Sequence, residues 1–99
     1  MSLALEFLPD AAIELEEATR FYEEQMPGLG LRYRLEVENA CVALVRDPLI
    51  HRERTGGFRR TNLHKFPYYI AYFIRGECMF IAAVAHASRH PDYWKNRLV

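Results

Sequence analysis

The sequence has few cysteines and no long hydrophobic run, and these absences exclude several classes of protein. Two cysteines, Cys41 and Cys78, occur among 99 residues, with no CxxC pair and no Cys/His spacing typical of zinc sites. We therefore expect two free, buried and reduced thiols, as in a cytoplasmic protein. The longest apolar run, residues 78–85, is far shorter than the roughly 18 residues of a membrane-spanning helix. Residues 1–6 also lack the basic stretch and apolar run of a signal peptide, so a cytoplasmic protein without a membrane partner is expected.

Glycine is also sparse, and the motifs of cofactor-dependent chemistry are missing. Gly28 and Gly30 are expected to separate two helices, whereas Gly56 and Gly57 precede a strand, so none of these glycines forms a phosphate-binding loop. The sequence contains no strand-turn-helix motif with a nucleophilic serine. We therefore expect no cofactor and no metal site.

The residues that are present suit one globular domain with an uneven distribution of charge. Hydrophobic residues make up 51% of the chain and aromatic residues 13%, which suffices for a core in a single domain spanning residues 1–99. Residues 1–40 carry nine acidic and three basic residues, whereas residues 41–99 carry four acidic and ten basic residues. This asymmetry indicates either a surface for a polyanion or acidic partner, or a solvated acidic helix packed near basic strands.

The first half of the chain shows the periodicity of one short strand and two helices. Residues 3–8 are apolar enough for a strand, and Asp10 is the expected N-cap of a helix over residues 11–26. A second helix is expected over residues 31–46, because Asp47-Pro48 stops it. We assign its main apolar stripe to four residues, with four more apolar residues beside them: Leu31, Leu35, Val42 and Val45, then Tyr33, Val37, Cys41 and Leu44.

The second half of the chain predicts three strands. They are expected over residues 58–66, 68–74 and 78–86, and the last two are joined by a tight hairpin at residues 75–77. The strand over residues 78–86 is the most apolar and is placed centrally, and one helical turn is expected around Tyr93 and Trp94. The order β-α-α-β-β-β predicts an α+β fold, an antiparallel-dominated twisted sheet with a helical hairpin on one face.

Three stretches of the sequence resemble a known family when they are taken together. They are residues 8–15 followed by Phe21-Tyr22-Glu23, then residues 59–72 with Arg59-Arg60 and Phe66-Pro67-Tyr68-Tyr69, and finally residues 84–94. In these stretches the chain resembles the RelE/ParE toxin superfamily, in particular its plasmid-stabilisation, ParE-like branch. The resemblance implies a toxin that is held inactive by an antitoxin protein. Members of the superfamily either cleave messenger RNA on the ribosome or poison DNA gyrase.

The nuclease branch offers a first set of candidate residues, in which basic side chains and a tyrosine assist attack by the RNA 2′-hydroxyl. The resemblance places Arg60, His86, Arg89 and Tyr93 in that role, should the chain be a metal-independent endoribonuclease. Three cations that the family pattern requires are replaced here, by Asn62, Tyr69 and Ala87. A single histidine such as His86 at the end of an apolar strand is more often a hydrogen-bonded structural residue than an acid or base.

A second set of candidates would contact a partner or a nucleic acid: Arg59, Arg60, His64, Lys65, Tyr69, Arg89 and Trp94. Arginines can contact phosphates and aromatic rings can stack on bases, but the same residues also suit a solvated sheet edge and a core. We expect a ParE-like toxin that inhibits growth through gyrase. The alternatives are a ribosome-dependent endoribonuclease and a decayed toxin that only binds its antitoxin. We also expect Tyr93 and Trp94 to fold back onto the domain, because their exposure would leave a large apolar area in water.

Overall fold

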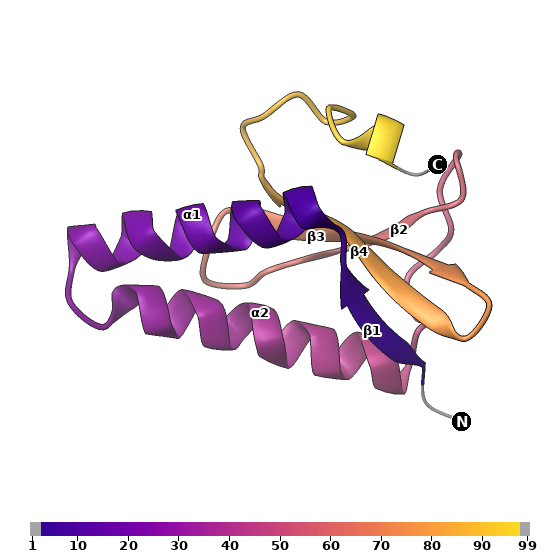
Figure 1. The fold of residues 1–99 in the computed structure, drawn as a ribbon, viewed down its shortest axis with the longest axis horizontal. Helices are drawn as coiled ribbons and strands as arrows, with labels where there is room; N and C mark the ends of the chain where they lie inside the picture. The colour runs from indigo at the N-terminus through magenta and orange to yellow at the C-terminus, as the bar shows by residue number, and fades with distance from the viewer. Residues whose placement is uncertain (1–2, 98–99) are drawn as a thin grey trace.

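The computed structural model describes residues 3–97, and they form a mixed sheet with two helices. The elements are β1 (Ala4–Phe7), α1 (Pro9–Gln25), α2 (Leu29–Arg46), β2 (Arg59–Asn62), β3 (Tyr68–Arg75), β4 (Cys78–His86) and a short 3₁₀ helix η1 (Lys95–Arg97). The order of elements and the α+β class agree with the prediction (Figure 1).

The sheet has the strand order β1-β4-β3-β2, so β4 and β3 are internal and β1 and β2 are the edges. β1 pairs in parallel with β4, whereas β4 pairs with β3 and β3 with β2 in antiparallel register. The predicted antiparallel-dominated sheet and the internal position of residues 78–86 are confirmed. β1 pairs only with Cys78–Ile81, so the later part of β4 has no β1 neighbour.

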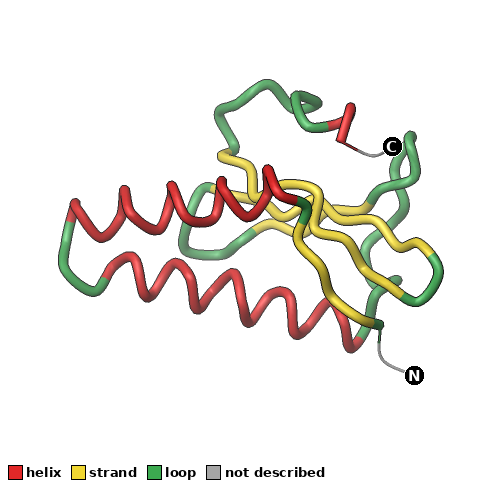
Figure 2. The backbone as a smooth tube through the Cα atoms, viewed as in Figure 1, coloured by secondary structure: helices red, strands yellow, loops and turns green. Residues whose placement is uncertain are grey.

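The two helices pack as a hairpin on one face of the sheet, and the C-terminal segment lies on the side of α1 that faces away from α2 (Figure 2). The helices and one sheet face bury a cluster that includes Leu15, Tyr33, Val37, Ile70 and Ile81. A second cluster on the other face joins Trp94 of the C-terminal segment to residues of β3, β4 and the loop before β2. The C-terminal segment therefore covers part of the sheet face that the helices leave open.

The helix ends and the buried face of α2 differ from the prediction. α1 begins at Pro9 after the N-cap Leu8, so Asp10 lies inside the first turn and is not the cap. Proline is favoured at this first position because its missing N–H would be unpaired there. The core-facing residues of α2 are Gly30, Tyr33, Val37, Cys41 and Leu44, whereas Leu31, Leu35 and Val42 are exposed. Both stripes are apolar, so periodicity alone did not identify the buried one.

Gly30 also differs from its expected role as a separator of helices. It lies within α2, where a Cβ would stand 2.6 Å from the backbone oxygen of Thr19 in α1. Its N–H and that of Gly28 donate to the carboxylate of Glu23. Gly30 is therefore a close contact between the two helices.

β2 is shorter than the predicted strand over residues 58–66. The backbone N–H groups of His64 and Lys65 donate to Glu36 Oε2 of α2, at 2.6 and 3.2 Å, instead of continuing the ladder. The prediction that both thiols are buried is correct only for Cys41. Cys78 is partly exposed.

Candidate functional site

Glu14 of α1 binds the C-terminal segment to the rest of the molecule. Its carboxylate accepts hydrogen bonds from the backbone N–H of Val84 at 3.0 Å, from Arg97 Nη1 and Nη2 at 3.0 and 3.2 Å, and from the hydroxyl of Tyr93. Arg89 Nη1 lies 3.7 Å from the same carboxylate. The Glu14 side chain is 11% exposed and that of Arg97 17% exposed, so this is a mostly buried polar cluster.

The strand lengths explain why a carboxylate lies at this position. β1 ends at Phe7, so the N–H of Val84 on β4 has no strand neighbour. α1 follows β1 directly, and its second turn brings Glu14 beside that free N–H. A buried N–H without a partner would cost about 1–3 kcal/mol, and Glu14 removes this cost.

The cluster changes the electrostatics of the residues that contact it. Burial and the hydrogen bond to Glu14 raise the pKa of Tyr93, against the opposing charges of Arg89 and Arg97. Burial is the largest single influence on Arg97 and lowers its pKa, but the hydrogen bonds to Glu14 together with the charges of Glu14, Tyr93 and Asp10 outweigh it, so the pKa of Arg97 is raised. The guanidinium of Arg89 also lies 3.7 Å from the centre of the Tyr93 ring. Two of the four nuclease candidates, Arg89 and Tyr93, are therefore engaged by Glu14.

His86 lies next to Arg89, in a shallow depression of about 190 Å³ that Tyr68 and Val84 also line. Its Nδ1 accepts the backbone N–H of Ser88 at 3.0 Å, and the Ser88 hydroxyl lies 2.7 Å away. The Tyr68 ring meets the imidazole edge-on at 4.9 Å. Two carboxylates, Glu14 and Glu17, share this depression and would repel a phosphate.

Arg60, the fourth nuclease candidate, lies in a different environment. Its guanidinium stacks 3.7 Å from the centre of the Tyr69 ring and donates to Asn62 Oδ1 at 3.3 Å. The Tyr69 hydroxyl in turn accepts from Trp94 Nε1 at 2.9 Å and donates to the carbonyl of Pro91. The structure therefore brings together His86, Arg89 and Tyr93, and no contact among the described residues joins Arg60 to them.

The remaining candidates for partner contact have mixed surroundings. Arg59 donates to the carbonyl of His51 at 2.6 Å and pairs with Glu53 at 3.6 Å. The Trp94 side chain is fully buried, and Tyr93 packs against the same cluster, so the expected folding back of both aromatic residues is confirmed. Tyr69 is also buried, and its ring is covered by Arg60.

Glu14 and Arg97 are central to the cluster and were not among the candidates from the sequence. A signal for Glu14 was present, because it lies on the same helical face as Ala11, Leu15 and Ala18, all of which are buried. An acid on the buried stripe of an amphipathic helix needs a partner. Arg97 offered no comparable signal.

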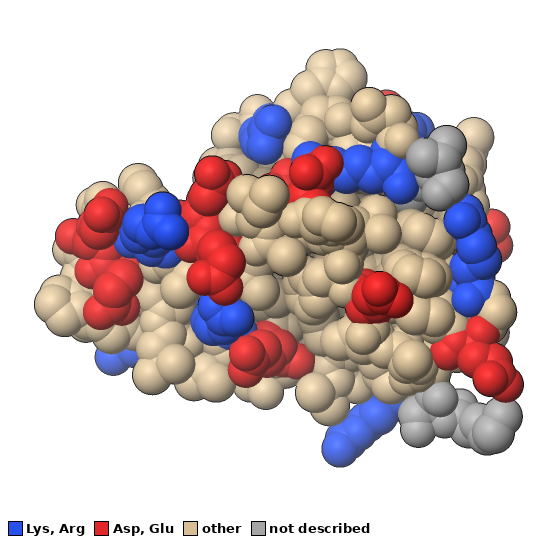
Figure 3. All heavy atoms as spheres, viewed as in Figure 1, with Lys and Arg blue, Asp and Glu red and all other residues tan. Residues whose placement is uncertain are grey.

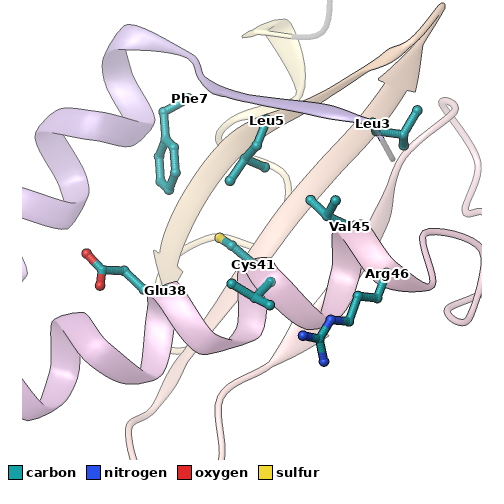
Figure 4. Close-up of a pocket in the computed structure, with 8 residues that line it drawn as sticks. Leu3, Leu5, Phe7, Glu38, Cys41, Val45 and Arg46 are labelled. Carbon is teal, nitrogen blue, oxygen red and sulfur yellow. The ribbon is translucent and has the colours of Figure 1, made fainter. Parts of the chain in front are cut away.

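A second feature is an apolar groove between β1 and α2, with a volume of about 750 Å³. Figure 4 shows Leu3, Leu5 and Phe7 of the β1 segment facing Cys41 and Val45 of α2. Glu38 and Arg46 flank it from α2, and Val42 also lines it. Since β1 is an edge strand, the groove lies beside backbone groups that have no strand neighbour on that side in the part of the chain that the structure describes.

The charges of the helices separate from those of the strands. Figure 3 shows acidic side chains gathered over the helical hairpin, interleaved with a few basic ones, and a mainly uncharged area over β1. Arg34 of α2 bonds to Glu16 of α1 at 2.6 Å. Most acidic residues of the first half of the sequence thus lie on a solvated helical surface. Residues 3–97 contain no helix long and apolar enough to cross a membrane, and no group of three His, Cys, Asp or Glu residues placed to hold a metal ion.

Comparisons with known proteins place this fold in a family. A structure described as the chromosomal ParDE toxin–antitoxin system of P. aeruginosa superposes with a TM-score of 0.77 at 16% identity, covering 88% of this chain and 98% of that one. A mutant of the E. coli toxin RelE in the free state superposes with a TM-score of 0.65 at 18% identity, covering 89% and 86%. No curated protein matches the sequence. The family model of the ParE toxin of the type II toxin–antitoxin system parDE matches residues 5–91, and the chain therefore belongs to the ParE toxin family.

Proposed function

We propose that the chain inhibits growth in the cytoplasm by acting on DNA gyrase, as a ParE-like toxin, and that an antitoxin holds it inactive. The observation that carries the choice of target is the engagement of Arg89 and Tyr93 by Glu14. RNA cleavage needs cations free to stabilise a phosphorane and a group free to move protons. Here two cations, Arg89 and Arg97, neutralise the carboxylate of Glu14 instead.

The replaced cations support the same choice. Asn62 accepts a hydrogen bond from Arg60, Tyr69 is buried, and Ala87 lies in the exposed turn after β4. Each positioned catalytic group of this kind is worth about 10²–10⁴ in rate. A site without three of them would retain little nuclease activity, even if their effects are not additive.

The experiment is expression of the chain in cells without its antitoxin, followed by measurement of both DNA integrity and transcript length. Gyrase poisoning predicts DNA breaks and full-length messages. Ribosome-dependent cleavage predicts shortened messages that disappear in His86→Ala and Arg89→Ala variants. A decayed toxin predicts neither effect and no inhibition of growth.

We further propose that the groove between β1 and α2, together with the free edge of β1, binds the antitoxin. An extended segment added to β1 would pair its backbone with the free edge and place apolar side chains in the groove. Because Glu38 and Arg46 flank the groove, we expect the antitoxin segment to place a basic residue near Glu38 and an acidic residue near Arg46.

Binding at the groove can be tested with two exposed positions on the same helix. Val42 lines the groove and is 51% exposed, whereas Leu31 is 61% exposed and lies outside it. Val42→Glu should abolish co-purification with the antitoxin, and Leu31→Glu should leave it intact. Equal co-purification of both variants would contradict this site.

A further inference from the structure

The loop before β2 forms a hairpin that carries several arginines. The N–H of Arg54 donates to the carbonyl of Phe58 at 2.7 Å, and the N–H of Gly57 donates back to the carbonyl of Arg54 at 3.0 Å. Gly56 and Gly57 adopt φ values of 102° and 82°, which side chains other than glycine rarely allow. The Arg59 side chain closes the base of the hairpin on the carbonyl of His51.

The register of this hairpin brings three arginines to one side. Arg54 lies opposite Phe58, and Arg52 and Arg60 each lie two residues further from the turn. Residues two apart in an extended hairpin point to the same side, so Arg52, Arg54 and Arg60 share the side of Phe58. Phe58 packs on Trp94 at 4.5 Å, which places this side on the sheet face away from the helices.

No carboxylate in residues 3–97 pairs with these three arginines. The neighbouring Glu53 contacts Arg59. The pKa of Arg54 is lowered, mainly by partial desolvation and to a smaller extent by the charges of Arg52 and Arg60. The second effect indicates that the three charges lie close together. Like charges gathered on neighbouring strands destabilise a fold, so a bound anion would relieve a cost already present.

The stack of Arg60 on Tyr69 supplies the geometry for an oxyanion. It places the guanidinium carbon 3.7 Å from the centre of the Tyr69 ring. A planar guanidinium can donate two parallel hydrogen bonds to a phosphate. Lys95 lies on the same side, 5.5 Å from the centre of the Phe58 ring, although it also pairs with Asp92.

We propose that Arg52, Arg54 and Arg60 form a surface that binds the phosphodiester backbone of nucleic acid. Protein partners are anchored by aromatic residues and arginines in well-packed, desolvated pockets. The large exposed apolar residues of the described chain lie elsewhere: on β1, on the two helices, at Met26 between the helices, and at residues 49–50. Of the last two, Ile50 lines a depression beside α2. A surface with clustered charge and no apolar anchor suits a polyanion better. The proposal goes beyond the inhibition of gyrase and does not require it.

The test is the binding of the purified chain to a short labelled DNA duplex and to an RNA of the same length, measured by fluorescence anisotropy between about 50 and 200 mM salt. Replacement of all three arginines by alanine should remove about three phosphate contacts. The slope of log K against log salt on duplex DNA should then become less steep by about 2.7, at roughly 0.9 per contact. Replacement of the three arginines by lysine should retain the slope, because the charge remains. It should also weaken binding, because lysine cannot donate the bidentate hydrogen bonds of a guanidinium.

Arg20→Ala is the matched control, since Arg20 is an exposed arginine on α1 that makes no ion pair among the described residues. It should bind like the wild-type chain, and thermal melting should show all variants folded. Tighter binding to DNA or to RNA would identify which nucleic acid the surface takes. Absence of binding, an unchanged slope in the triple alanine variant, or equal competition by polyglutamate would overturn the proposal, the last in favour of an acidic protein.

Discussion

Replacement of Glu14 by glutamine should destabilise the protein more than any exposed acidic substitution on the same helix. Glutamine keeps the size of the side chain but removes the charge that Arg97 and Arg89 share. It also places an amide N–H₂ where only acceptors fit, facing the N–H of Val84 and the donors of Arg97. The expected result is a partly buried arginine without its counter-charge.

The magnitude follows from the burial of the pair. Removing one partner of a buried ion pair costs about 3–5 kcal/mol. Because Glu14 is 11% and Arg97 17% exposed, we expect the lower end, about 3 kcal/mol. For a domain of this size 1 kcal/mol shifts Tm by about 4–8 °C, so Tm should fall by roughly 12–24 °C.

Glu17→Gln is the control, since Glu17 lies one turn further along α1, is exposed and makes no ion pair or hydrogen bond among the described residues. It should change the free energy of unfolding by no more than about 0.5 kcal/mol. A cycle with Arg97→Gln should give a coupling between Glu14 and Arg97 of about 0.5–3 kcal/mol. Equal Tm values for the Glu14 and Glu17 variants would refute the assignment of Glu14 as the residue that holds the C-terminal segment.

Four further results are expected from the same structure. Tyr33→Phe should stabilise the protein by up to about 1 kcal/mol in chemical denaturation, because the buried Tyr33 hydroxyl has no hydrogen-bond partner within residues 3–97; a loss of stability would reveal one. Gly30→Ala should lower stability by about 1–3 kcal/mol, because its Cβ would meet Thr19; an unchanged Tm would disprove this close contact. One thiol, Cys78, should react with a thiol reagent in the native state, whereas Cys41 is buried and burial raises its pKa to about 11; rapid labelling of Cys41 would contradict this. The contribution of Tyr33 and Tyr93 to stability should be constant below about pH 10 and fall above it, because burial raises the pKa of both residues and the unfolded chain releases those protons first. The fall should be shallower in Tyr93→Phe, and stability that rises with alkaline pH would show the sign to be wrong.

The elements were predictable from the sequence because their patterns are local. The bounds of β4, Cys78–His86, agree with the prediction, since a continuous apolar run next to a Gly76 turn leaves little choice. The buried face of α2 was not predictable in this way. Its exposed residues Leu31, Leu35 and Val42 are as apolar as its buried ones, and the rotation of the helix depends on contacts with distant residues, such as that of Gly30 with Thr19.

The site was predictable only in part, because it depends on contacts between distant residues. His86, Arg89 and Tyr93 lie close in sequence, and the structure brings them together. Their interpretation as nuclease residues changes because of Glu14, which lies more than 70 residues earlier in the sequence. A local sequence pattern does not predict the partners of Glu14. Arg60 and Arg54 likewise lie near each other through the turn at Gly56 and Gly57, two residues that the sequence indicated only as preceding a strand.

The central claim is that this ParE-family toxin acts on gyrase and does not cut RNA. The most direct measurement uses the purified chain with gyrase, ATP and closed circular DNA, and compares supercoiling and cleaved DNA with and without the toxin. A parallel reaction contains ribosomes and a defined message. The account predicts loss of supercoiling with accumulation of gyrase-cleaved DNA, while the message stays full length. Normal supercoiling together with ribosome-dependent cleavage of the message, lost in the His86→Ala or Arg89→Ala variant, would contradict it.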